Sequence, residues 1–133
     1  MVSERWKKSK TVTYNINYHI IWCVKYRRKL LFDDIDKRLK ELLKYKSKEI
    51  DIDIKTLETD KDHIHLFVQA DPTKGIHWIV QQLKGYTSRL LRQEFSILRT
   101  RVPSLWTRSY YVETIGHISE KTIVKYIEEQ KNH

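Results

Sequence analysis

Hydrophobic and polar residues alternate along four stretches of the chain, as they do in strands that bury one face. In the first stretch Tyr18, Ile20 and Trp22 share one side, while Asn17 and His19 share the other. A short polar turn separates the second stretch from the third, so we expect these two strands to pair as a hairpin. The four predicted strands cover residues 11–24, 50–58, 63–70 and 110–114.

Hydrophobic residues recur every three or four positions in three other stretches, which is the spacing of one face of a helix. Asp33 or Asp34 can cap the first helix, and Ser119 can cap the last. Gly85 and the β-branched Thr87 weaken the pattern in the middle of the second helix. The predicted helices cover residues 35–48, 76–95 and 119–130, and a loop is expected over 99–104.

The predicted elements follow the order β-α-β-β-α-β, and a further helix comes after them. This order indicates an α+β fold of the ferredoxin-like (RRM-like) kind, which is an antiparallel sheet with two helices on one face. The opposite face of the sheet is then expected to be open. No internal repeat, linker or low-complexity stretch divides the sequence, so we expect a single domain over residues 1–133.

Composition narrows the class of protein. Hydrophobic residues make up 40% of the 133 residues, which is ordinary for a globular domain. No apolar run is long enough to cross a membrane, and the basic N-terminus leads into no apolar signal core. We therefore expect a cytoplasmic protein with no membrane partner. The single Cys23 excludes an internal disulfide and a cysteine-based zinc site.

The net charge of +9 favours a polyanionic partner, because basic side chains gain free energy by replacing counterions along a phosphate backbone. Aromatic residues interleave with the basic ones, which is typical of surfaces that bind single-stranded nucleic acid. In the alternative interpretation the aromatics belong to the core and the lysines only solvate the surface. The candidates for contact with a DNA backbone are Lys25, Arg27, Arg28, Lys84, Arg89, Arg92 and Arg108.

The third predicted strand begins with His63-Ile64-His65. Because side chains alternate in direction along a strand, both imidazoles project from one face, opposite to Ile64 and Leu66. Two neighbouring imidazoles make half of a divalent-metal site, although strand histidines also serve simply as hydrogen-bonding groups at a sheet surface. We expect the pair on the open face of the sheet. The other histidines are expected to be structural or exposed, and these are His19, His77, His117 and His133.

The last predicted helix carries Tyr126 and Gln130, which are one turn apart and therefore share a face. A tyrosine on a terminal helix is often only a packing residue whose hydroxyl reaches solvent. Here the carboxamide oxygen of Gln130 could supply a third, hard metal ligand beside the phenol. Tyr110 and Tyr111 are alternatives to Tyr126, but as strand residues they have no such neighbouring amide.

Five motifs occur in order across nearly the whole chain, at residues 18–27, 62–66, 79–90, 105–116 and 126–130. Together they resemble the single-tyrosine HUH transposases of small insertion sequences, in which HUH denotes two histidines around a hydrophobic residue. The resemblance implies that Tyr126 is a nucleophile that forms a 5′-phosphotyrosine intermediate. It also implies that His63, His65 and Gln130 hold a divalent metal, for which we expect Mg²⁺ or Mn²⁺.

The same resemblance implies partners. The substrate is expected to be single-stranded DNA with folded hairpins near the element ends, and the protein a homodimer in which one subunit's tyrosine helix can complete the other's site. The expected function is a transposase that binds, cleaves and rejoins this DNA. Two alternatives remain: a ferredoxin-like module that binds single-stranded nucleic acid without catalysis, and a host-adopted nickase that acts on repeated palindromes.

Overall fold

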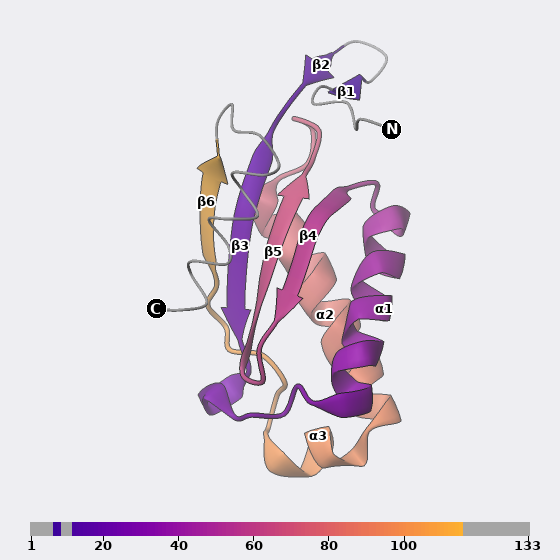
Figure 1. Cartoon of the computed structure of the whole chain (residues 1–133), viewed down its shortest axis with the longest axis vertical. Coiled ribbons are helices and arrows are strands. Elements are labelled where there is room, and N and C mark those ends of the chain that lie inside the picture. Colours follow the sequence, from indigo (N-terminus) through magenta and orange to yellow (C-terminus); the bar gives the residue numbers. More distant parts are fainter. Residues whose placement is uncertain (1–6, 9–11, 116–133) are drawn as a thin grey trace.

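The computed structural model describes residues 7–8 and 12–115 of the chain. All four predicted strands are present, as β3 (Asn17–Cys23), β4 (Asp53–Thr59), β5 (His63–Gln69) and β6 (Tyr111–Ile115). They form one antiparallel sheet in the order β4-β5-β3-β6, in which β4 and β5 pair as the predicted hairpin (Figure 1).

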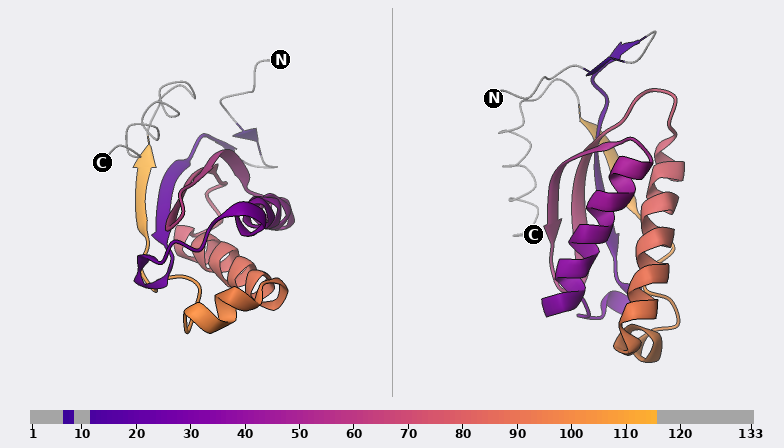
Figure 2. Two further views of the ribbon diagram at one scale, coloured as in Figure 1. Left: turned by 60° about the horizontal axis from the view of Figure 1, so that its bottom comes forward. Right: turned by 90° about the vertical axis from the view of Figure 1, so that its right-hand side faces the viewer.

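Two helices, α1 (Asp33–Glu49) and α2 (Ile76–Glu94), cover the same face of this sheet (Figure 2). The order β3-α1-β4-β5-α2-β6 is therefore the predicted β-α-β-β-α-β order. α2 continues through Gly85 without interruption, and the Thr87 hydroxyl donates a hydrogen bond to the Leu83 carbonyl at 2.7 Å. The predicted helix over 119–130 lies outside the described residues. Within the described part of the chain, no helix combines the length and apolar character needed to span a bilayer.

The hydrophobic core lies between the sheet and the two helices. Ile20, Ile64 and Leu66 from the central strands and Leu39 and Leu83 from the helices are all 0% exposed. The even-numbered side chains of β3 and β5 thus face the helices, as the alternation predicts. Because neighbouring side chains on a strand point to opposite faces, the odd-numbered side chains of both strands lie on the other face.

The first predicted strand is divided in two. Residues 13–14 form β2 (Thr13–Tyr14), which pairs with β1 (Lys7–Lys8) in a separate two-stranded sheet, so the continuous strand expected over 11–24 is wrong. Asn15 lies at the division, and its side-chain carbonyl accepts hydrogen bonds from the amides of Asn17 at 2.7 Å and Gln69 at 2.9 Å. Such side-chain bonding competes with a regular strand ladder.

The ends of α1 also differ from the prediction. Phe32 occupies the N-cap position and no side chain caps the helix, so neither Asp33 nor Asp34 is the cap. Both carboxylates lie in the first turn, where negative charge interacts favourably with the helix dipole. At the other end Asp51 adopts a left-handed conformation with φ 57°, and β4 begins after it, later than expected.

A short helix, α3 (Ser96–Arg101), occupies part of the stretch predicted as a loop over 99–104. Six residues are too few for a hydrophobic period to reveal a helix in the sequence. The Arg92 guanidinium supports this helix, because its Nη1 donates to the carbonyls of Leu98 at 3.1 Å and Val102 at 3.0 Å. These bonds satisfy carbonyl groups that the end of a helix leaves without intrahelical partners.

Candidate metal and nucleic-acid site

β5 places two histidines on the face of the sheet that is turned away from the helices. His63 pairs with Cys23 of β3 and His65 pairs with Ile21, and the two imidazole centroids are 4.9 Å apart. The expectation that this face is open is wrong at its centre. His65 is only 3% exposed and Phe67, further along the same strand, is 1% exposed. The centre of this face therefore buries the polar side chain of His65 on the same strand as the buried Phe67.

Two carboxylates from the β4–β5 turn flank His63. Its Nε2 lies 3.0 Å from Asp60 Oδ2, and its Nδ1 lies 2.6 Å from Asp62 Oδ1. Arg27 also reaches Asp62, at 3.3 Å. Burial alone would raise the pKa of the Asp62 carboxyl, but the hydrogen bond with His63 and the charge of Arg27 outweigh it, so that pKa is lowered. Asp62 is therefore an ionised acceptor for the Nδ1 proton of His63.

His65 has a different neighbour, the buried His19 of β3. The Nδ1 atom of His65 is 3.5 Å from Nε2 of His19, whose own Nδ1 is 3.6 Å from Glu113 Oε1 on β6. Burial lowers the pKa of His19, and the contact with Glu113 opposes this only in part. The sequence predicted His19 as structural or exposed. The structure places it inside the candidate site, in line with His65.

Asp60, His63 and His65 together fit a divalent metal ion. One potential ligand atom from each lies within 4.8 Å of the other two, which is compact enough for shared coordination. Two imidazoles and one carboxylate form a donor set that several divalent metals accept, and three protein ligands leave positions open for substrate oxygen or water. Asp60 is an addition to the predicted site, because in the sequence it is only a polar residue in a turn.

The predicted cations lie in several different parts of the structure. Lys25, Arg27 and Arg28 lie in or directly after the short 3₁₀ helix η1 (Lys25–Arg27), and Arg27 pairs with Asp62, which itself contacts His63. Lys84 instead has a structural role, because its ammonium group donates to the backbone carbonyls of residues 107 and 109, and burial lowers its pKa. Arg108 is exposed.

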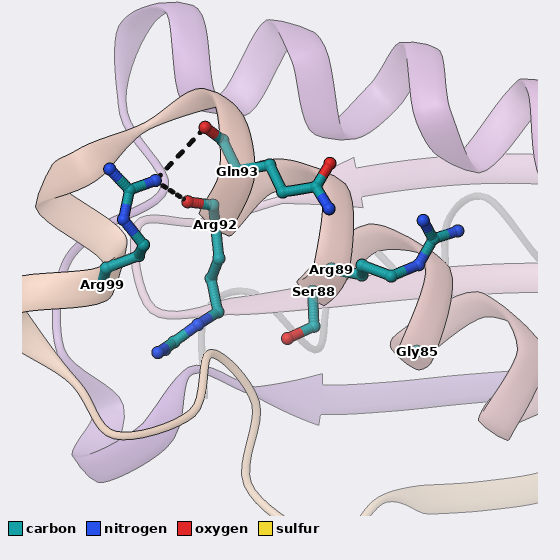
Figure 3. A pocket seen from close by; sticks show the side chains of 6 residues that line it. All are labelled: Gly85, Ser88, Arg89, Arg92, Gln93 and Arg99. Carbon is teal, nitrogen blue, oxygen red and sulfur yellow. Dashed lines mark hydrogen bonds between the residues drawn. The ribbon is translucent and has the colours of Figure 1, made fainter.

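Three arginines line a groove between α2 and α3 (Figure 3). The groove has a volume of about 560 Å³, and Arg99 is held across it by hydrogen bonds from its guanidinium to the carbonyls of Arg92 and Gln93. None of the described residues that line it is acidic. Its lining consists of Gly85, Ser88, Arg89, Arg92, Gln93 and Arg99.

A model of the family described as "Transposase IS200 like" matches residues 12–130 of this chain. The ISDra2 transposase of Deinococcus radiodurans is 33% identical over 93% of this chain and 90% of its own length. The chain belongs to the IS200-like transposase family. The predicted resemblance is confirmed, and membership supports a DNA strand-transfer activity for this IS200-like transposase.

Other relatives agree with this assignment. The transposase of insertion element IS200 from Salmonella typhimurium is 29% identical over 88% of this chain and 78% of its own length. A crystal structure of a candidate transposase from Deinococcus radiodurans R1 has a TM-score of 0.78 at 32% identity and covers 93% of this chain and 97% of that one. A REP-associated tyrosine transposase bound to a REP hairpin has the same fold, with a TM-score of 0.62 at 11% identity over 94% and 74% of the two chains.

Some predicted residues lie outside the described part of this transposase. These are Tyr126, Gln130, His117 and His133. The alternative tyrosines can be placed: the Tyr111 hydroxyl donates to Glu113 Oε2 at 2.9 Å, and the Tyr110 hydroxyl lies 2.9 Å from Nδ1 of the exposed His77. The hydrogen bond to Glu113 is the main cause that raises the pKa of Tyr111. Tyr111 is thereby disfavoured as a phenolate nucleophile.

Proposed function

We propose that this IS200-like transposase cleaves and rejoins single-stranded DNA at the ends of its element, through a 5′-phosphotyrosine intermediate on Tyr126. The observation that carries the proposal is the assembled donor set of Asp60, His63 and His65 in a chain of this family. Tyr126 falls within the matched residues 12–130. The active unit is a homodimer that acts on strands with folded hairpins near the ends.

Covalent catalysis explains how such an enzyme can rejoin DNA without an external energy source. The Tyr126 oxygen attacks the scissile phosphorus, the bond from phosphorus to the 3′-oxygen breaks, and a 3′-hydroxyl leaves. The bond energy is conserved in the phosphotyrosine, and a second 3′-hydroxyl reverses the step onto a new strand. The phenol, with an unperturbed pKa near 10, must lose its proton during the attack.

His63 and His65 would hold Mg²⁺ or Mn²⁺, Asp60 would supply an oxygen ligand, and Gln130 is the further ligand that the family resemblance adds. When bound, the ion polarises a non-bridging phosphate oxygen and stabilises the departing 3′-oxygen. Asp62 accepts the Nδ1 proton of His63 and so keeps Nε2 directed at Asp60. Carboxylate partners of this kind orient metal-ligating histidines in many proteins.

The arginine groove supports a second contact with the DNA backbone. It lies on the helix layer, whereas the histidines lie on the opposite face of the sheet. Arg89 is exposed at the groove, and Arg99 lines the same groove. We assign phosphate binding to this groove, because cations unbalanced by acidic neighbours gain free energy by replacing counterions. Lys25, Arg27 and Arg28 would contact the strand near the histidines.

Adduct formation tests the proposed chemistry. Purified protein is incubated with a single strand that spans the element ends, with Mn²⁺ or with a chelator. We expect a covalent protein–DNA species that needs the metal, is absent in Tyr126→Phe and His63→Ala, and still forms in the matched variant Tyr111→Phe. An adduct in Tyr126→Phe contradicts the nucleophile. A wild-type protein that binds its own ends but forms no adduct with metal present favours the non-catalytic module.

Mixing the two inactive variants tests the shared site of the homodimer. A heterodimer of Tyr126→Phe and His63→Ala combines one intact metal site with one intact tyrosine from the other subunit. Adduct formation on mixing means that Tyr126 acts in trans. If both variants form heterodimers by light scattering and tag exchange but no adduct appears, Tyr126 acts within its own subunit.

A further inference from the structure

His19 and His65 are joined edge to edge across β3 and β5. The strand register places His19 opposite Phe67 and so diagonally adjacent to His65 on the same face. Their facing nitrogens are 3.5 Å apart, their centroids are 5.7 Å apart, and their planes differ by 15°. Each ring nitrogen lies one ring radius from the centroid of its own ring, and the centroid separation exceeds the nitrogen distance by about two such radii. The two facing nitrogens therefore lie between the centroids, nearly in the plane of both rings, as an N–H···N hydrogen bond requires.

Glu113 sets the direction of this hydrogen bond. It pairs directly with His19 across β3 and β6, and its Oε1 lies 3.6 Å from His19 Nδ1. A carboxylate can only accept protons, so its negative charge favours the His19 tautomer that carries the proton on Nδ1. His19 is 0% exposed, where an uncharged imidazole is favoured, and a neutral imidazole has one donor and one acceptor. With the proton on Nδ1 facing Glu113, Nε2 is the acceptor.

The tautomer of His65 follows from that of His19. If His19 Nε2 accepts, then His65 Nδ1 must carry the proton that it donates, and the lone pair of His65 remains on Nε2. We propose that His19 is a positioning residue that, with Glu113, fixes His65 as the Nδ1–H tautomer so that its Nε2 ligates the metal ion. This inference rests on the metal role in the proposed function. Asp62 does the same for His63 in a single step.

Metal affinity and histidine tautomers test this role without any DNA. His19→Phe keeps a planar ring but removes both nitrogens, and we expect it to weaken Mn²⁺ binding by about tenfold or more, as loss of an outer partner typically does. His19→Gln keeps an acceptor for His65 and a donor for Glu113, so it should restore most of the affinity. His77→Phe, at an exposed histidine, is the matched control and should bind Mn²⁺ like wild type.

Nitrogen NMR of the metal-free protein gives the second measurement. We expect His65 with its proton on Nδ1 in wild type, and loss of this preference in His19→Phe. A wild-type His65 protonated on Nε2, or unchanged Mn²⁺ affinity in a folded His19→Phe, overturns the proposal. If His19→Phe fails to fold, Glu113→Leu takes its place, because it removes the carboxylate that accepts the His19 Nδ1 proton. Affinity and tautomer unchanged in Glu113→Leu then overturn it as well.

A wild type that binds Mn²⁺ with the expected tautomers but forms no DNA adduct contradicts the phosphotyrosine chemistry and supports the His19 role. If wild type forms a metal-dependent adduct but His19→Phe changes neither the His65 tautomer nor the Mn²⁺ affinity, the phosphotyrosine chemistry is supported. The positioning role of His19 is then overturned.

Discussion

The buried Thr87 hydroxyl links α2 to the segment that leads to β6. Its removal should lower the free energy of unfolding by an amount that can be worked out from the structure. Thr87 is 0% exposed, and its Oγ1 accepts a 3.0 Å hydrogen bond from the indole nitrogen of Trp106, which is 5% exposed. The same hydroxyl donates to the Leu83 carbonyl at 2.7 Å. Thr87→Val preserves the side-chain shape but leaves the Trp106 N–H without this acceptor.

The expected cost follows from the burial of that N–H. A buried donor left without a partner costs about 1–3 kcal/mol, and the lost Thr87–Leu83 bond adds little because the Leu83 carbonyl lies inside a helix. We therefore expect the free energy of unfolding to fall by about 1–3 kcal/mol. For a chain of this size the melting temperature should fall by about 3–5 °C for each kcal/mol.

A double-mutant cycle isolates the hydrogen bond itself. Wild type, Thr87→Val, Trp106→Phe and the double variant are unfolded in urea and followed by far-ultraviolet circular dichroism. The two changes should be non-additive by about 1 kcal/mol, since each removes the same contact. Thr87→Ser keeps the hydroxyl and should retain the coupling to Trp106. Additivity within about 0.5 kcal/mol refutes the reasoning, as would a Thr87→Val protein as stable as wild type.

Three further predictions concern charge. Asp60→Asn should weaken Mn²⁺ binding by at least about tenfold in a calorimetric titration, because a carboxylate ligand is lost. The control Asp51→Asn changes a 94% exposed side chain and should bind Mn²⁺ like wild type. Equal affinities of the two variants would show that Asp60 does not bind the metal. Arg89→Gln should lower the affinity for single-stranded DNA and make the slope of log affinity against log salt shallower by about 0.7. Arg101→Gln changes an arginine outside the groove and should leave both the affinity and the slope unchanged. Matching slopes for the two variants would contradict phosphate binding in the groove. Hydrogen bonds from Lys74 and Thr73 lower the pKa of Asp71 to about 2, below its unfolded value, so its stabilising effect is present above about pH 4 and is lost as the pH falls through about 2. Urea unfolding of Asp71→Asn should therefore show a destabilisation at pH 7 that disappears near pH 2, and a difference that persists at pH 2 would show another origin.

The sequence was sufficient for the parts of the fold that depend on a repeated pattern. Period-two alternation located β3, β4, β5 and β6, and helical spacing located α1 and α2, because each buries one face against a shared core. Elements held by individual contacts were missed. α3 depends on the bonds from the Arg92 guanidinium to Leu98 and Val102, and the break before β3 depends on the side chain of Asn15. Neither contact leaves a periodic signal.

The candidate site also depends on contacts that a pattern within one strand does not predict. Alternation correctly placed His19 on the polar face of its own strand and His63 with His65 on the polar face of theirs. It could not bring them together, because His19 and His65 are 46 positions apart and meet only if Ile20 pairs with Leu66. A slip of one residue in the pairing turns a strand's side chains to the opposite face. The buried residues that fix this register therefore also position the proposed metal ligands. A core substitution that shifted β5 against β3 would separate His65 from His19 without changing either histidine.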